Sequence, residues 1–184
     1  MDVINMLKIT IPGKEFYDEQ KEEFVYYGDT TLKLEHSLVS ISKWEGKWCK
    51  PFLSSNDKSV EEIIDYIKCM TITQNVKSET YERLTEQNLK DINSYIDAPM
   101  TATTFRDTGG RSSGEIITSE IIYYWMITFN IPFECQKWHL NRLLALIKVC
   151  NIKNSPPKKM SAQEVMRRNK ELNAQRRNSL NTKG

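Results

Sequence analysis

The first part of the chain alternates between apolar and polar positions, which is the period of a β-strand. Period-two runs occur at Leu7–Ile11 and Thr30–Leu34, and between them Glu15–Tyr17 and Phe24–Tyr26 flank a polar turn. Short alternating runs bounded by glycine, proline or polar residues are typical of antiparallel strands. The pattern therefore predicts a small antiparallel β-meander at the N-terminus.

From Ser37 onward the apolar residues recur every three or four positions, which is the period of an amphipathic helix. The first helix should end before Pro51, and it is the nearest apolar partner for the meander, because isolated strands are marginal in water. A second helix should begin at Ser59, whose side chain can cap it, and reach Met70. The next apolar pattern, at 78–95, can restart at Thr85.

Two apolar segments follow. Ile116–Phe129 is apolar on nearly every side, Asn130-Ile131-Pro132 interrupts it, and an apolar pattern resumes over Phe133–Cys150. A helical hairpin is expected, and an all-round apolar first arm should lie at the centre of the body. The residues expected to be buried are Ile121, Trp125, Leu143 and Ile147.

Charge divides the chain into two parts. Residues 155–184 hold eight Lys or Arg and two Asp or Glu, which leaves 18 of the 26 basic and 22 of the 24 acidic residues in 1–154. A body with a net charge of −4 thus carries a tail of +6. The prediction is an α+β body at 1–154, in which the β-meander packs on a mainly α-helical bundle, and a basic C-terminal helical arm at 155–184, with Ser161 and Glu164 forming a capping box.

The composition limits the class of protein. Hydrophobic residues make up 39% of the chain, enough for a core. No basic cluster precedes an apolar run at the N-terminus, so we expect no signal peptide and a cytoplasmic protein. The longest apolar run, Ile116–Phe129, contains Glu120 and is shorter than the roughly 20 residues of a membrane span, so no membrane contact is expected.

Few residues are suited to catalysis or metal binding. The chain has two histidines, His36 and His139, and four cysteines without a C-x-x-C pair. Cys135 and His139 could share a helix face, but no further ligands stand at metal-binding spacing. A catalytic His36 at a strand-to-helix junction is possible, although a histidine bonded to backbone is the commoner arrangement. We expect no metal, no cofactor and no enzymatic activity.

Three segments have both a binding and a structural interpretation. Gly109-Gly110-Arg111 could form an anion-binding nest or a flexible loop. Trp44 and Trp48, with lysines interleaved, could stack on nucleic-acid bases or pack against the meander. The tail could fold on a partner or remain a solvated arm; its candidate partner-binding residues are Arg167, Arg168, Arg176 and Arg177.

Three longer strings resemble one family. They are LKLEHSL running through SISKWE to KPF (32–52), ITSE running into YYWM (117–126), and IPFECQKWHL (131–140). They are similar to strings in tail assembly chaperones of long-tailed bacteriophages, small non-virion proteins encoded in tail modules. The resemblance extends over most of the chain, including its basic end, and it carries over no catalytic residue.

The resemblance implies a protein of the host cytoplasm that binds the tape measure protein, the major tail tube protein or other copies of itself during tail morphogenesis. Such chaperones are often also made in an extended form by ribosomal frameshifting. Two alternatives remain open at this point: a small nucleic-acid-binding protein that uses the basic tail, and an enzyme whose site is assembled from residues interpreted here as structural.

Overall fold

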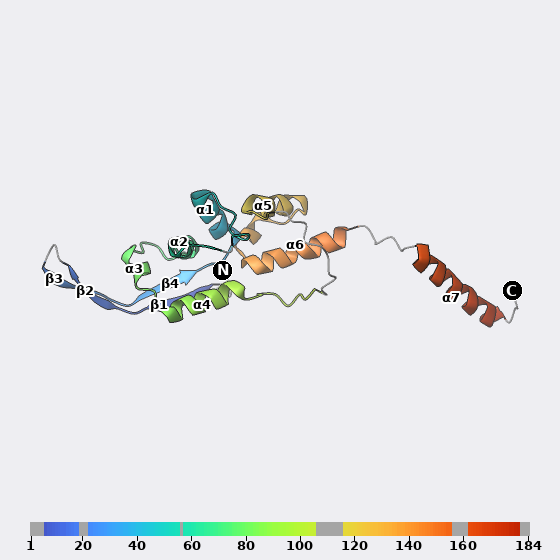
Figure 1. Cartoon of the computed structure of the whole chain (residues 1–184), viewed down its shortest axis with the longest axis horizontal. Coiled ribbons are helices and arrows are strands. Elements are labelled where there is room, and N and C mark those ends of the chain that lie inside the picture. The colour runs from blue at the N-terminus through green and yellow to red at the C-terminus, as the bar shows by residue number, and fades with distance from the viewer. Residues whose placement is uncertain (1–5, 19–21, 56, 106–115, 156–161, 181–184) are drawn as a thin grey trace. The chain divides into compact units, whose positions relative to one another are not determined.

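The computed structural model describes residues 6–18, 22–55, 57–105, 116–155 and 162–180. It divides into two units, Met1–Asn151 and Ile152–Gly184. The predicted α+β class is confirmed, and the strands among the described residues lie near the N-terminus (Figure 1). The Gly109-Gly110-Arg111 motif and the capping residue Ser161 lie outside the described residues.

The four predicted strands are present, but they form a two-stranded ribbon instead of a meander. β1 (Leu7–Ile11) pairs with β4 (Thr30–Leu34), and β2 (Lys14–Asp18) pairs with β3 (Glu23–Tyr27), both antiparallel. The two ladders share one register, because the numbers of paired residues sum to 41 from Leu7↔Leu34 to Asp18↔Glu23. One long hairpin therefore turns only once, after Asp18.

The ribbon continues past the gap between its two ladders because Pro12-Gly13 on one strand lies opposite Gly28-Asp29 on the other. Gly13 N–H donates to Asp29 Oδ1 over 2.7 Å, across the ribbon. A Cβ on Gly13 would lie 2.7 Å from the carbonyl oxygen of Tyr27, so only glycine permits this close approach. Proline at position 12 and glycine at position 28 thus mark an interruption of the ladder, and not the chain reversals that the pattern suggested.

The inner face of the ribbon is covered by α4 (Glu86–Asp97), and not by the first helix. Asn88 Nδ2 on α4 donates to the carbonyl oxygen of Thr10 on β1 over 3.2 Å. The apolar side chains of β1 and β4 enter the core, with Ile9, Ile11, Leu32 and Leu34 buried. The helix that follows the ribbon in sequence, α1 (Leu38–Trp48), packs instead on α2 (Val60–Met70) and α5 (Ser119–Thr128).

The predicted helix cap at Ser59 is confirmed. Ser59 caps α2 and forms a reciprocal pair with Glu62. The 78–95 segment breaks into α3 (Glu79–Glu82) and α4, and Thr85 caps α4 in the same way, through Asn88. These bonds depend only on residues three apart, which explains why the sequence was sufficient.

The expected helical hairpin is present in altered form. After α5, residues Phe133–Lys137 form the short 3₁₀ helix η2, and α6 (Leu140–Asn154) begins only after His139. Leu143 and Ile147 are buried as predicted, but the expected burial of Ile121 and Trp125 is wrong, because both are half-buried. The face of α5 that enters the core carries Ile122 and Met126 instead, so α5 lies at the surface of the body.

A buried glutamate joins α5 to α1. Glu45 Oε2 accepts the Ser119 N–H over 2.7 Å, and Oε1 accepts the Phe52 N–H over 2.7 Å. Glu45 is 7% exposed. Its carboxylate thus receives an N–H from the first turn of α5 and fixes the segment that follows α1, a role for which the sequence offers no local signal.

The second unit contains α7 (Ala162–Leu180), in which no residue is buried. The predicted boundary at 154/155 and the interpretation of this segment as a detachable arm stay predictions.

Candidate interaction surfaces

The two tryptophans predicted to bind a partner lie between α1 and α2. Trp44 has no exposed surface, and its Nε1–H donates to the carbonyl oxygen of Glu62 over 2.9 Å. Trp48 is half-buried, stacks on Trp44 with ring centroids 6.2 Å apart, and donates from Nε1 to Asp65 Oδ2 over 3.0 Å. Trp44 therefore cannot stack on a nucleic-acid base in this fold, and a partner role for Trp48 stays a prediction.

The lysines beside these tryptophans are held by acidic residues of α2. Lys47 Nζ forms an ion pair with Asp65, and Lys50 Nζ forms one with Glu62. Bonds from Lys50 and from the Ser59 N–H hold the pKa of Glu62 below its usual range. The positive charges of Lys47 and Lys50 are thus balanced within the body, which weakens the face around Trp48 as a nucleic-acid surface.

The two histidines, far apart in sequence, meet in the core. Their ring centroids lie 5.0 Å apart, and the backbone of His36 accepts the Leu140 N–H over 2.9 Å. His36 Nδ1 lies 2.5 Å from the Tyr66 hydroxyl. His139 Nε2 lies 2.9 Å from the Tyr95 carbonyl oxygen, which can only accept, so this nitrogen carries the proton.

Burial controls the charge of both rings. It lowers the pKa of His36 to about 3, with a further contribution from His139, and it lowers the pKa of His139 as well. Both imidazoles are therefore neutral at pH 7 and closed to solvent, as in a hydrogen-bonded core pair. The same burial excludes substrate from them.

The Cys135–His139 arrangement does not assemble a ligand set. Both residues are buried, and Asn141 N–H donates to His139 Nδ1 over 3.3 Å. Burial raises the pKa of the Cys135 thiol, which disfavours the thiolate that metals bind. Across the described ranges, no group of three or more His, Cys, Asp or Glu is placed to hold a metal ion.

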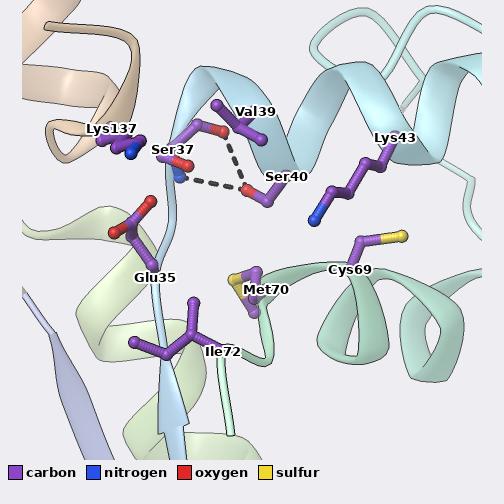
Figure 2. Close-up of a pocket in the computed structure, with 9 residues that line it drawn as sticks. All are labelled: Glu35, Ser37, Val39, Ser40, Lys43, Cys69, Met70, Ile72 and Lys137. Atoms are coloured by element: carbon purple, nitrogen blue, oxygen red, sulfur yellow. Dashed lines mark hydrogen bonds between the residues drawn. The ribbon is translucent and has the colours of Figure 1, made fainter. Parts of the chain in front are cut away.

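A hollow of about 240 Å³ opens where the ribbon passes into α1 (Figure 2). Lys43 and Cys69 lie on one side of it, and Glu35 and Lys137 on the other. The Ser40 hydroxyl faces the backbone of Ser37, with which it forms two hydrogen bonds of 3.0 and 2.8 Å. The hollow is smaller than most ligand sites, and its lining pairs no nucleophile with a base.

An apolar surface lies on α5. Glu120 is the only charged residue among its ten, yet Tyr124 and Ile127 are 64% and 61% exposed. Beside them, α5 and α6 border a hollow of about 400 Å³ lined mainly by apolar side chains: Trp125, Phe129, Leu144, Ile147, Lys148 and Asn151. A helix that is apolar on all sides but buried on one leaves a surface suited to another apolar chain.

A second exposed apolar surface lies on β2 and β3, which project past α3 (Figure 1). Tyr17 and Phe24 form a cross-strand pair with ring centroids 5.1 Å apart. Tyr17, Phe24 and Tyr26 are 53%, 69% and 70% exposed. The sequence pattern predicts a strand at these aromatics but no binding surface, although three aromatic side chains on a ribbon with few helical neighbours are a signal of one.

Arg83, at the end of α3, holds the ribbon at its interruption. Its Nη1 lies 3.1 to 3.4 Å from the carbonyl oxygens of Pro12, Tyr27 and Gly28, and Nη2 lies 3.3 Å from Thr30 Oγ1. The guanidinium is also 5.5 Å from the Tyr27 ring centroid. Arg83 is 8% exposed, so it directs the aromatic ribbon relative to the body.

We expect Arg83→Ala to lower the free energy of unfolding by roughly 1.5–3 kcal/mol, because charged hydrogen bonds to backbone carbonyl oxygens are lost. Amides of β2 and β3 should then exchange with solvent faster than those of α4. Arg83→Lys should not restore the lost stability, because the lysine ammonium lacks the planar, forked set of N–H donors of a guanidinium. Urea unfolding and hydrogen exchange measure both effects, with exposed Lys90→Ala as control; equal exchange in the Arg83→Ala variant and the native protein would contradict the assignment.

The arm distributes its four predicted binding arginines over different faces. Arg168 and Arg176 share a face with Val165 and Leu172, because these positions are three or four apart. Arg167 lies off that face and pairs with Glu171 over 3.6 Å, and Arg177 also lies off it. The structure thus brings together only two of the four, and their binding role stays a prediction.

Comparisons with known proteins leave these surfaces without a counterpart. No family model, curated protein or solved structure matches the chain. Within the described part of the chain, no helix combines the length and the apolar character needed to cross a membrane.

Proposed function

We propose that this protein is a non-enzymatic tail assembly chaperone of a long-tailed bacteriophage. It would act in the host cytoplasm and bind the tape measure protein, the major tail tube protein or both during tail morphogenesis. The resemblance of the three strings supports the family, and the exposed apolar surface of α5 supports the binding of an apolar client.

The three strings meet in the body. The first contains the end of β4 and all of α1 with Glu45, the second contains most of α5, and the third contains η2 and His139. Glu45 joins the first to the second, and the His36–Leu140 backbone bond joins the first to the third. The strings therefore mark the packing centre of the body, which is consistent with a shared fold and leaves the binding surfaces to be argued separately.

The observation that carries the proposal is the exposed apolar side of α5. A long apolar helical client needs its surface covered until it is enclosed, and Tyr124, Ile127 and the hollow between α5 and α6 offer an apolar strip for one face of a helix. Binding through such a strip requires no catalytic residue and no cofactor.

The test is binding of purified tape measure fragments by a double variant, Tyr124→Lys/Ile127→Lys. We expect affinity to fall by at least about tenfold, since two charges enter an apolar contact. The matched control is Val60→Lys/Ile63→Lys, which changes two exposed apolar residues of α2. Circular dichroism checks that each variant is folded. Unchanged binding by the α5 variant, or equal loss in the control, would count against α5 as the client surface.

The alternative is a nucleic-acid-binding protein, and the exposed basic helix α7 is the observation that favours it. Phosphate contacts lower log K by about 0.9 per log unit of salt for each neutralised phosphate on duplex DNA. Oligonucleotide anisotropy across a salt series therefore separates the two functions. Micromolar, salt-dependent binding at physiological salt would favour the alternative.

A further inference from the structure

The aromatic ribbon and the basic arm are complementary in charge and in the chemistry of their exposed side chains. The sequence from Lys14 to Tyr27 holds five Asp or Glu and two Lys, a net charge of −3, whereas residues 155–184 carry +6. Both segments also expose apolar side chains, three aromatics on the ribbon and Val165 and Leu172 on α7. The two segments are thus opposite in net charge and share exposed apolar side chains.

One face of the ribbon presents these features together. Glu15 pairs with Tyr26 across the strands, and Tyr17 pairs with Phe24, so alternation places all four side chains on the same face. All four residues are exposed. A carboxylate beside three aromatic rings suits a guanidinium group, which can bond the carboxylate and stack on a ring.

One face of α7 presents the matching groups. Val165, Arg168, Leu172 and Arg176 follow at intervals of three, four and four residues. From Val165 to Arg176 this face is about 17 Å long at 1.5 Å per residue. On the ribbon face, Glu15 and Tyr17 lie two residues apart, about 7 Å along the strand. The α7 face is therefore longer than the ribbon face, and the two match in charge and in side-chain chemistry.

Contact between the two segments of one chain would leave the protein monomeric, whereas contact between two copies makes it self-associate. The oligomeric state therefore separates the two arrangements.

From these observations we propose that α7 of one copy docks on the Glu15–Tyr17–Phe24–Tyr26 face of the ribbon of a second copy. Arg168 and Arg176 meet the acidic aromatic face, and Val165 and Leu172 cover its rings. Each copy then offers one ribbon and one arm, so the contact is head-to-tail and can extend into a chain or close into a ring. The inference stands apart from the proposed function, because it involves neither α5 nor a client.

The experiment is sedimentation velocity of the nuclease-treated full-length protein at about 50 mM and 500 mM salt. Native protein should self-associate at low salt and dissociate at high salt. Arg168→Glu/Arg176→Glu should raise the dissociation constant on the order of 100-fold through like-charge contacts. Arg167→Glu/Arg177→Glu, with the same change of net charge on other faces, should remain associated.

Complementation tests the direction of the contact. A Phe24→Ser/Tyr26→Ser variant keeps its arm, and the Arg168→Glu/Arg176→Glu variant keeps its ribbon, so each alone should be monomeric and a mixture should form 1:1 dimers. Adding Glu15→Lys to the arm variant should restore self-association by a charge swap, without touching the aromatic residues. Four results would each overturn the proposal: a monomeric native protein, equal effects of the two arginine pairs, a mixture without dimers, or association that requires nucleic acid. Tape measure binding through α5 should be unchanged in all these variants.

Discussion

Replacing Glu45 with alanine should lower the free energy of unfolding by roughly 2–6 kcal/mol, because two buried N–H donors each lose their partner at about 1–3 kcal/mol. The donors are the amides of Phe52 and Ser119, and both contacts to Glu45 are 2.7 Å long. Loss of the carboxylate should free both α5 and the segment after α1. Urea unfolding followed by circular dichroism measures the change.

Two further substitutions test whether the lost carboxylate acceptor causes the destabilisation. Glu45→Gln keeps one acceptor oxygen but points an amide N–H₂ at the second donor, so we expect it to recover only part of the loss. Glu61→Ala removes an exposed glutamate of α2 and should cost less than about 1 kcal/mol. If Glu45→Ala were as mild as Glu61→Ala, the join between α1 and α5 would not contribute to stability.

Acidification should unfold the body through its histidine pair. His36 has a pKa of about 3 in the fold, below the ordinary value of 6.5, because its ring is buried beside His139. Below pH 6.5 the unfolded chain therefore binds a proton that the folded chain does not, and stability falls as the pH falls from 6.5 toward 3. The loss is about 1.4 kcal/mol per pH unit, roughly 5 kcal/mol over the window. The lowered pKa of His139 acts in the same direction.

The measurement is urea unfolding at intervals between pH 7.5 and 5, above the ordinary range of carboxylates. We expect a loss of roughly 2 kcal/mol from His36 alone by pH 5. His36→Gln should be less stable at pH 7.5, because the bond to Tyr66 changes, but its stability should depend less on pH. An equal pH dependence in this variant and in the native protein would show that His36 titrates normally in the fold.

The sequence alone was sufficient for features that depend on near neighbours. Alternation located β1 and β4, a polar turn between short apolar segments located β2 and β3, and the apolar period with Ser59 located α2. The restart at Thr85, which the pattern left open, is the start of α4. Capping bonds and amphipathic periods involve residues two to four positions apart, so their energies can be read locally. The same reasoning correctly placed Leu143 and Ile147 in the core.

Strand pairing and the direction in which α5 packs depended on distant contacts. The pattern at Pro12-Gly13 is compatible with a turn or with an interruption, and the Gly13–Asp29 bond with the Arg83 clamp decides for the interruption. On α5, nearly every side is apolar, so the sequence shows only a weak preference for one face and does not show which face is buried. The sequence likewise does not show whether Trp44 is exposed or buried, because its burial depends on the contact with α2.

What the sequence by itself determined is the α+β class, the places of the strands and of α1, α2 and α4, and the separation of charge between body and tail. Only the tertiary structure decided that the strands form one projecting ribbon, that α4 covers it, that Glu45 and the two histidines join segments distant in sequence, and that α5 stays at the surface. The reason is physical: periodicity and caps are set by neighbours along the chain, whereas register, burial and shared hydrogen bonds are set by groups that meet only after folding.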